Sequence, residues 1–77
     1  MGKLFFENSQ GVRREIATNI NKEDCGKEIQ KFIHDHNKGR PKDKKFHSYY
    51  TRTWEENDET VFDVGSHTEF FYWNSKN

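Results

Sequence analysis

The chain has 77 residues, of which 30% are apolar and 34% are charged, so we expect one small domain, residues 1–77, with a limited core. Lysine plus arginine equal aspartate plus glutamate at 13 each, which excludes a generic electrostatic attraction to nucleic acid or to a membrane as the overall design. Self-association as a homodimer is one way in which so small a domain buries more apolar surface.

The sequence favours a soluble, cytoplasmic protein. A single cysteine, Cys25, excludes an internal disulfide framework and fits a reducing compartment. The N-terminal residues lack an apolar run of signal-peptide length, and no stretch approaches the roughly 20 apolar residues of a membrane span. We therefore expect no membrane association.

The first elements in chain order are two short strands. In Lys3–Glu7, Leu4 and Phe6 share one face and Phe5 takes the other. A turn cluster at residues 8–11 leads to a second strand, Val12–Thr18, in which Val12, Ile16 and Thr18 face one side and Arg13, Glu15 and Ala17 the other. Arg14 falls on the apolar side, which places the start of this strand at the rim of the sheet.

The apolar period then changes to that of a helix from Lys22 to His36. One helical face carries five residues, namely Cys25, Ile29, Phe32, Ile33 and His36. Asn21 is the expected N-cap, and Ile20 and Cys25 have the spacing of a hydrophobic staple. Asn37, Gly39 and Pro41 end the helix, and a basic loop at residues 38–45 follows, which we expect to be flexible.

The remaining chain predicts further strands at Phe46–Trp54, Thr60–Val64 and Glu69–Trp73, with a turn at Glu55–Glu59 and a frayed tail at residues 74–77. The fold class is therefore α+β, a two-layer ββαββ domain. Its antiparallel sheet has four to five strands, and the helix packs on one face. The other face would carry aromatic residues, with Phe5, Tyr49, Phe71 and Trp73 as candidates.

The segment Asp63-Val64-Gly65-Ser66-His67-Thr68-Glu69 is the best candidate for a specific site. Asp63, Ser66, His67 and Glu69 resemble fragments of an acid–base site, but Ser66 and His67 are neighbours and would face opposite sides of a strand. A structural bend fits better, with Asp63 and Ser66 bonding backbone groups around Gly65. A third interpretation is a cradle for a small nucleotide-like ligand, with donors from Ser66, His67 and Thr68.

The sequence does not indicate an enzyme, a metal site or a cofactor. His34 and His36 stand two positions apart on a helix, so their side chains diverge and do not share one ion. Glycine-rich phosphate loops and paired cysteine motifs are also absent from the sequence.

Two surfaces are candidates for partners. Tyr49, Tyr50, Arg52 and Trp54 combine the residue types that anchor protein interfaces. The same side chains beside the basic loop, with phosphate contacts from Arg40, Lys42, Lys44 and Lys45, would suit nucleic acid. Six acidic residues between Glu55 and Glu69 oppose phosphate, so a protein partner is favoured.

Three parts of the sequence carry a resemblance. These are the opening at Lys3–Ser9, the segment Ser48-Tyr49-Tyr50-Thr51-Arg52 with Trp54, and the block from Phe62 to Phe71. In these parts the chain resembles small uncharacterised proteins of bacteriophages and prophages that share an F-D-V-G-S-H-T-E-F-F-like block, with residues 38–45 as an extra loop. The resemblance implies a small accessory protein in a bacterial cytoplasm that binds a host protein as an inhibitor or adaptor, including in counter-defence.

Overall fold

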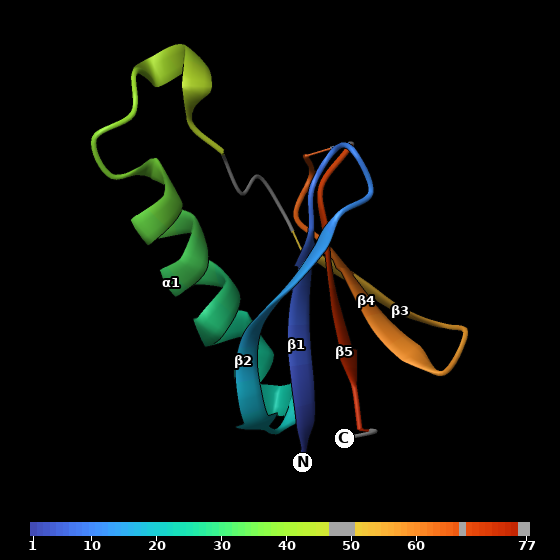
Figure 1. Cartoon of the computed structure of the whole chain (residues 1–77). Helices are drawn as coiled ribbons and strands as arrows, with labels where there is room; N and C mark the ends of the chain where they lie inside the picture. Colours follow the sequence, from blue (N-terminus) through green and yellow to red (C-terminus); the bar gives the residue numbers. More distant parts are fainter. Residues whose placement is uncertain (47–50, 67, 76–77) are drawn as a thin grey trace.

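The computed structural model describes residues 1–46, 51–66 and 68–75, and within them one sheet and one helix (Figure 1). The five strands are β1 (Gly2–Glu7), β2 (Arg13–Ile20), β3 (Arg52–Glu56), β4 (Glu59–Asp63) and β5 (Phe70–Asn74). The helix begins with a 3₁₀ turn, η1 (Lys22–Asp24), and continues as α1 (Cys25–Asn37); a second turn, η2 (Lys42–Lys44), follows. Every strand pair is antiparallel, in the order β2-β1-β5-β4-β3. The predicted α+β class is confirmed.

The last strand lies in the middle of the sheet. β5 pairs with β1 from Lys3↔Asn74 to Glu7↔Phe70, and its other edge pairs with β4. At the end of this pairing, a Cβ atom on Gly2 would lie 2.0 Å from the carbonyl oxygen of Asn74, so the close approach of the two strands requires glycine. Asn74 belongs to β5 and its amide donates to Glu59, so the predicted fraying of Asn74 is wrong.

The helix forms where its period predicted. Cys25, Ile29 and Ile33 are buried against the sheet, and Phe32 and His36 are half-buried beside them. Asn21 stands at the N-cap with an extended backbone, but its side chain makes no capping bond; only its carbonyl oxygen accepts from the Asp24 amide at 3.0 Å. The predicted cap is therefore correct in position but not in its side-chain contact.

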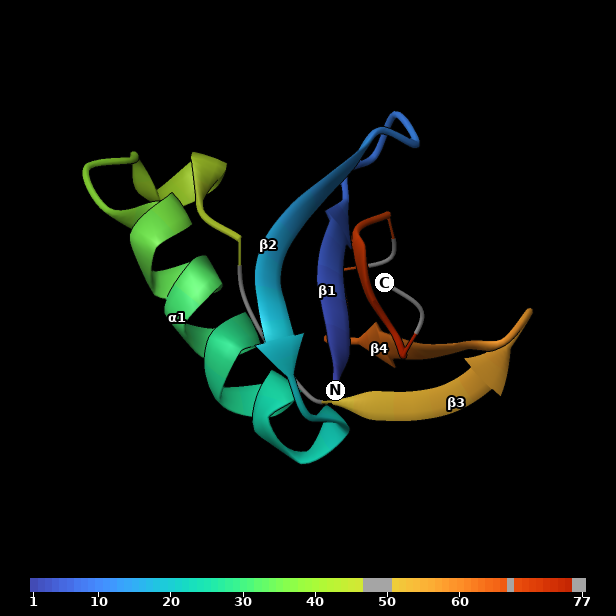
Figure 2. The same ribbon diagram turned by 60° about the horizontal axis from the view of Figure 1, so that its bottom comes forward.

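The helix α1 lies on one side of the sheet (Figures 1 and 2), and a single hydrophobic core fills the space between them. Its buried members come from every layer of the fold: Leu4, Phe6, Ile20, Cys25, Ile29, Ile33, Phe46, Phe62, Val64 and Phe71. Phe6 is at its centre, with ring centroids 4.7 Å from Phe32 and 5.2 Å from Phe71. Since each buried aromatic ring removes roughly 150–250 Å² from water, this cluster compensates for the small number of apolar residues.

The predicted strand Phe46–Trp54 is wrong at its beginning. β3 begins only at Arg52, and Phe46 is a core residue after the basic loop rather than a strand residue. The side chain of Asn37, the last residue of α1, bonds both backbone groups of Phe46: its Nδ2 donates to the carbonyl oxygen at 2.6 Å and its Oδ1 accepts from the amide at 2.7 Å. This pair of bonds returns the chain to the core.

The register of two strands also differs from the prediction. In β2, Leu4 pairs with Ala17 and Phe5 with Glu15, so Ile16 is an extra residue at a bulge. Ile16 and Ala17 therefore both pack against the core, and the predicted alternation across Val12–Thr18 is wrong. In β5, Phe71 and Trp73 lie opposite Phe6 and Leu4 on the side of the sheet that packs against the helix, not on the other side as predicted. Tyr49, the other candidate there, lies outside the described residues.

The β3–β4 hairpin turns over two residues only. Asn57 and Asp58 have φ of 52° and 64°, the left-handed values that a type I′ turn needs at both positions. Glu55, Glu56 and Glu59 of the predicted turn are thus strand residues.

Candidate functional site

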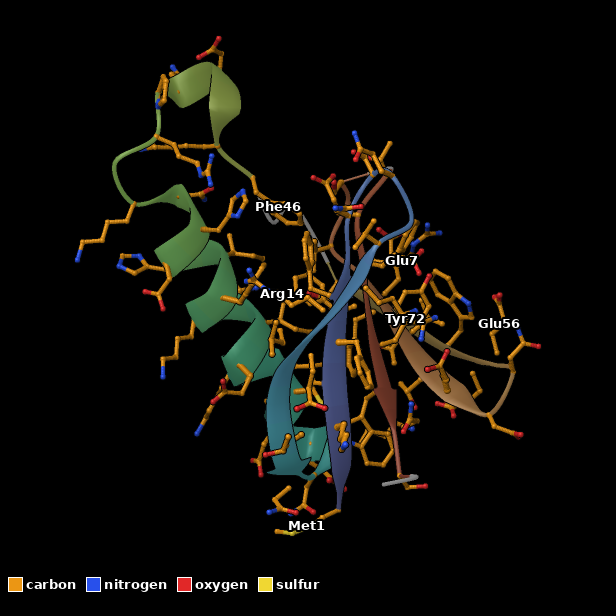
Figure 3. The ribbon with its side chains drawn as sticks, in the orientation of Figure 1. Met1, Glu7, Arg14, Phe46, Glu56 and Tyr72 are labelled. Carbon is orange, nitrogen blue, oxygen red and sulfur yellow. The ribbon has the colours of Figure 1, made fainter. Side chains whose placement is uncertain are left out.

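The sheet face opposite α1, called the open face below, carries a row of aromatic side chains that is interrupted only by Val61. Strand register places Phe5, Tyr72, Val61 and Trp54 side by side across β1, β5, β4 and β3, with Phe70 beside Trp54. In Figure 3, Glu7, Tyr72 and Glu56 lie on this side, whereas Arg14 and Phe46 lie between the sheet and the helix. No described helix covers the open face.

Arg13 spans the open face from β2 to β4. Its Nε donates to Glu7 at 3.0 Å, and its two Nη atoms donate to Glu59 at 2.8 and 3.0 Å. The guanidinium also stacks over Tyr72, 3.9 Å from the ring centroid. The hydrogen bonds to Arg13 hold the pKa of the Glu59 carboxyl below its usual value, and those to Glu59 raise the pKa of Arg13. The side chains around Arg13 are therefore already paired with one another within the chain.

Trp54 forms the accessible end of the open face. It is 37% exposed, its ring meets Phe70 edge-on at 6.5 Å, and the guanidinium of Arg52 lies 5.8 Å from its centroid. Arg52 also pairs with Asp63 at 2.6 Å. The structure thus brings together Arg52 and Trp54 of the predicted partner-binding set, while Tyr49 and Tyr50 lie outside the described residues.

The bend after β4 is held by its own polar groups. Asp63 is 4% exposed; its Oδ2 faces Arg52, and its Oδ1 accepts from the Gly65 amide at 2.9 Å, where φ is 91°. Ser66 and Thr68 both donate to Glu69 Oε1, the latter at 2.7 Å. The Asp63 contact is the structural role expected for this residue, whereas Ser66 bonds a carboxylate instead of the backbone. His67 lies outside the described residues.

The basic loop lies at the C-terminal end of α1, far from the β3–β4 hairpin (Figure 1). Arg40, Lys42 and Lys45 are exposed, and the side chain of Lys44 is not among those described. Arg40 Nε donates to the carbonyl oxygen of His36 at 2.5 Å. Because loop and hairpin lie apart, the predicted phosphate contacts do not adjoin Trp54.

A groove that the sequence did not predict lies between α1 and the β1–β2 hairpin. Two hollows of about 330 and 430 Å³ share four lining residues, Arg14, Phe32, His36 and Arg40. Burial, followed by the charge of Arg40, lowers the pKa of His36, against the opposing charge of Glu69. In the sequence, only the position of Arg14 on the apolar side of its strand points to this groove. The lining residues come from three separate segments, and a local pattern does not show that these segments meet.

Within the described residues, no three His, Cys, Asp or Glu side chains lie close enough together to hold a metal ion. No described helix has the length and apolar character needed to cross a membrane. Comparisons of the chain with protein-family models, with curated proteins and with solved structures found no match.

Proposed function

We propose that this protein acts without catalysis, by binding another protein through the Trp54 end of the open face. The observation that carries this proposal is the exposure of Trp54 between Arg52 and Phe70 on a face that no described helix covers. Tryptophan, tyrosine and arginine are the residues that most often dominate binding energy at protein interfaces. A tryptophan side chain has only two rotatable bonds, so it also loses little conformational entropy on binding.

The charges of the open face favour a basic protein surface as the partner. The face carries Lys3, Arg13 and Arg52 against five acidic residues, which are Glu7, Glu15, Glu56, Glu59 and Asp63. The hairpin tip adds Asp58 beside Glu56. Such a face repels the phosphates of nucleic acid and complements lysine- or arginine-rich protein surfaces. The resemblance to phage proteins supports a protein of the bacterial host, with this chain as inhibitor or adaptor.

The contacts of the polar bend support a binding role rather than an enzymatic one. Asp63 is committed to Arg52 and Gly65, and Glu69 to Ser66 and Thr68. A general base must instead reach a substrate proton. These carboxylates stabilise the connection that leads into β5.

The test is affinity capture from bacterial lysate, followed by a measured dissociation constant with the purified captured protein. Trp54→Ser removes the exposed anchor, and Val12→Ser is the matched control, since Val12 is an exposed apolar residue away from the open face. We expect Trp54→Ser to weaken binding at least about tenfold and Val12→Ser to leave it unchanged.

Equal binding by folded wild-type and Trp54→Ser proteins would refute the proposal. Sedimentation of the purified chain adds a second outcome. If the wild type is a dimer and Trp54→Ser a monomer, the partner at this end of the open face is a second copy of the chain.

A further inference from the structure

We propose that the groove between α1 and the β1–β2 hairpin, called the helix-end groove, binds a small phosphorylated ring compound of the nucleoside monophosphate class. Its two hollows share Arg14, Phe32, His36 and Arg40, and so lie next to each other around the same side chains. Their volumes, about 430 and 330 Å³, fall within the range of small-molecule sites. The site lies on the helix side of the sheet, away from the open face.

The larger hollow has the character of a phosphate site. Arg14, Lys38 and Arg40 line it with three positive charges, against one acidic residue, Asp35. Arg40 uses its Nε on the His36 carbonyl oxygen, which also neutralises the negative end of α1, and directs no other hydrogen bond within the described chain. Guanidinium groups bind phosphate with paired N–H donors, so the two arginines suit a phosphate monoester.

Arg14 and its neighbour Arg13 differ in a way that favours a ligand. Arg13 has two carboxylate partners and an aromatic stack on the open face. Arg14 forms no ion pair within the described residues, and its guanidinium lies 5.2 Å from the ring centroid of Phe32. A cation with unused donors over an aromatic ring, at the edge of a hollow, is available to an incoming anion.

The smaller hollow has the character of a ring site. Phe6, Val12 and Phe32 give it apolar walls, and His36 stacks on Phe32 at 6.0 Å. Glu69 lies at its edge, and one of its oxygens, Oε1, takes the hydroxyls of Ser66 and Thr68. In the proposed complex, the second oxygen of Glu69 would be the acceptor for a sugar hydroxyl or a ring N–H. A ligand with phosphate at one end and a flat polar ring at the other matches both hollows.

The test is isothermal titration calorimetry with amide chemical-shift mapping, using four probes: adenosine and guanosine monophosphate, adenosine, and inorganic phosphate. We expect a nucleoside monophosphate to bind more tightly than adenosine or phosphate and to shift the amides of residues 12–14 and 32–40. Arg14→Gln and Arg40→Gln should each weaken binding about tenfold, the effect of losing a charge-assisted hydrogen bond. Lys3→Gln, which removes one charge from the opposite face, should leave binding unchanged.

The same titrations have outcomes that would refute the proposal. Absence of saturable binding by both monophosphates up to about 10 mM would overturn it. If inorganic phosphate binds as tightly as the monophosphates, the ring makes no contribution to binding. If adenosine binds as tightly as adenosine monophosphate, the phosphate makes none. Either result overturns the assignment. Because Arg40 lies in an exposed loop, Arg40→Gln decides the matter even if Arg14→Gln fails to fold. Trp54→Ser should bind the nucleotide normally, which separates this site from the protein-binding one.

Discussion

Replacing Arg13 by methionine should destabilise the fold more than the same change at Arg14. Arg13→Met keeps the aliphatic stem but removes three hydrogen bonds, to Glu7 and Glu59, and the stack on Tyr72. Those contacts join β2, an edge strand, to β4 across two intervening strands. Arg14→Met is the matched control because it removes an equal charge from the adjacent position, where the guanidinium forms no ion pair with a described residue and lies 5.2 Å from the ring centroid of Phe32.

The expected magnitude follows from exposure. The Arg13 side chain is 38% exposed and that of Glu59 16%, so the ion pair is worth about 0.5–1 kcal/mol rather than the value of a buried one. Stacking on an aromatic ring at such a site adds about 0.5–1 kcal/mol. A loss of about 1–2 kcal/mol lowers the melting temperature of a domain of this size by roughly 5–15 °C. Arg14→Met should cost about 0.5 kcal/mol or less, hence a few degrees at most.

The assay is thermal unfolding followed by circular dichroism, at low and at high salt, because screening should shrink the difference between the two variants. A double-mutant cycle with Glu59→Gln measures the coupling itself and should return at least about 0.5 kcal/mol. Equal losses for Arg13→Met and Arg14→Met, or no coupling to Glu59, would show that the contacts across the open face do not stabilise the sheet.

Three further predictions concern the helix side. Asn37→Ala should cost about 1–3 kcal/mol in urea unfolding because it leaves two backbone groups of Phe46 unpaired, whereas Asn21→Ala, without a capping bond, should cost far less. Burial and the charge of Arg40 lower the pKa of His36, so as the pH falls below 6.5 the unfolded chain binds more protons than the native one and the free energy of unfolding decreases. His36→Gln should make the free energy of unfolding less dependent on pH in this range, and an NMR titration of His36 should give a pKa below 6.5. Burial, with nearby acids, raises the pKa of the Cys25 thiol to about 11. Iodoacetamide at mildly alkaline pH should therefore label Cys25 in the native protein only as fast as the fold opens around it, and unfolding in urea should make labelling fast. Fast labelling of the native protein would contradict this prediction.

Much of the fold follows from local signals in the sequence. The spacing of Cys25, Ile29 and Ile33 determines the buried side of α1, and Leu4 and Phe6 determine that of β1. These signals work because apolar residues recur with the period of one element and are separated by polar ones. The Asp63–Gly65 contact is also local, because a short polar side chain two residues before a glycine can accept from the glycine amide.

Other features depend on contacts that local patterns do not encode. The run from Phe70 to Trp73 is aromatic throughout, so alternation cannot tell which ring faces the helix; pairing with β1 decides it. The local pattern predicts Phe46 as a strand residue because aromatic residues favour strands, but two hydrogen bonds with the Asn37 side chain hold Phe46 in the core. Arg14 and Arg40 meet at one groove only because the hairpin and the end of α1 pack together.

The central position of β5 has a consequence for the order in which the protein folds. β1 cannot complete its pairing until β5 has been synthesised, since nearly the whole chain separates Leu4 from Trp73. The β1–β2 hairpin and α1 can form early from local contacts, but closing the sheet requires a contact of very high sequence separation, which slows folding. Until that step, β1 presents an unpaired edge beside exposed Phe6, and the nascent chain is most vulnerable to aggregation there.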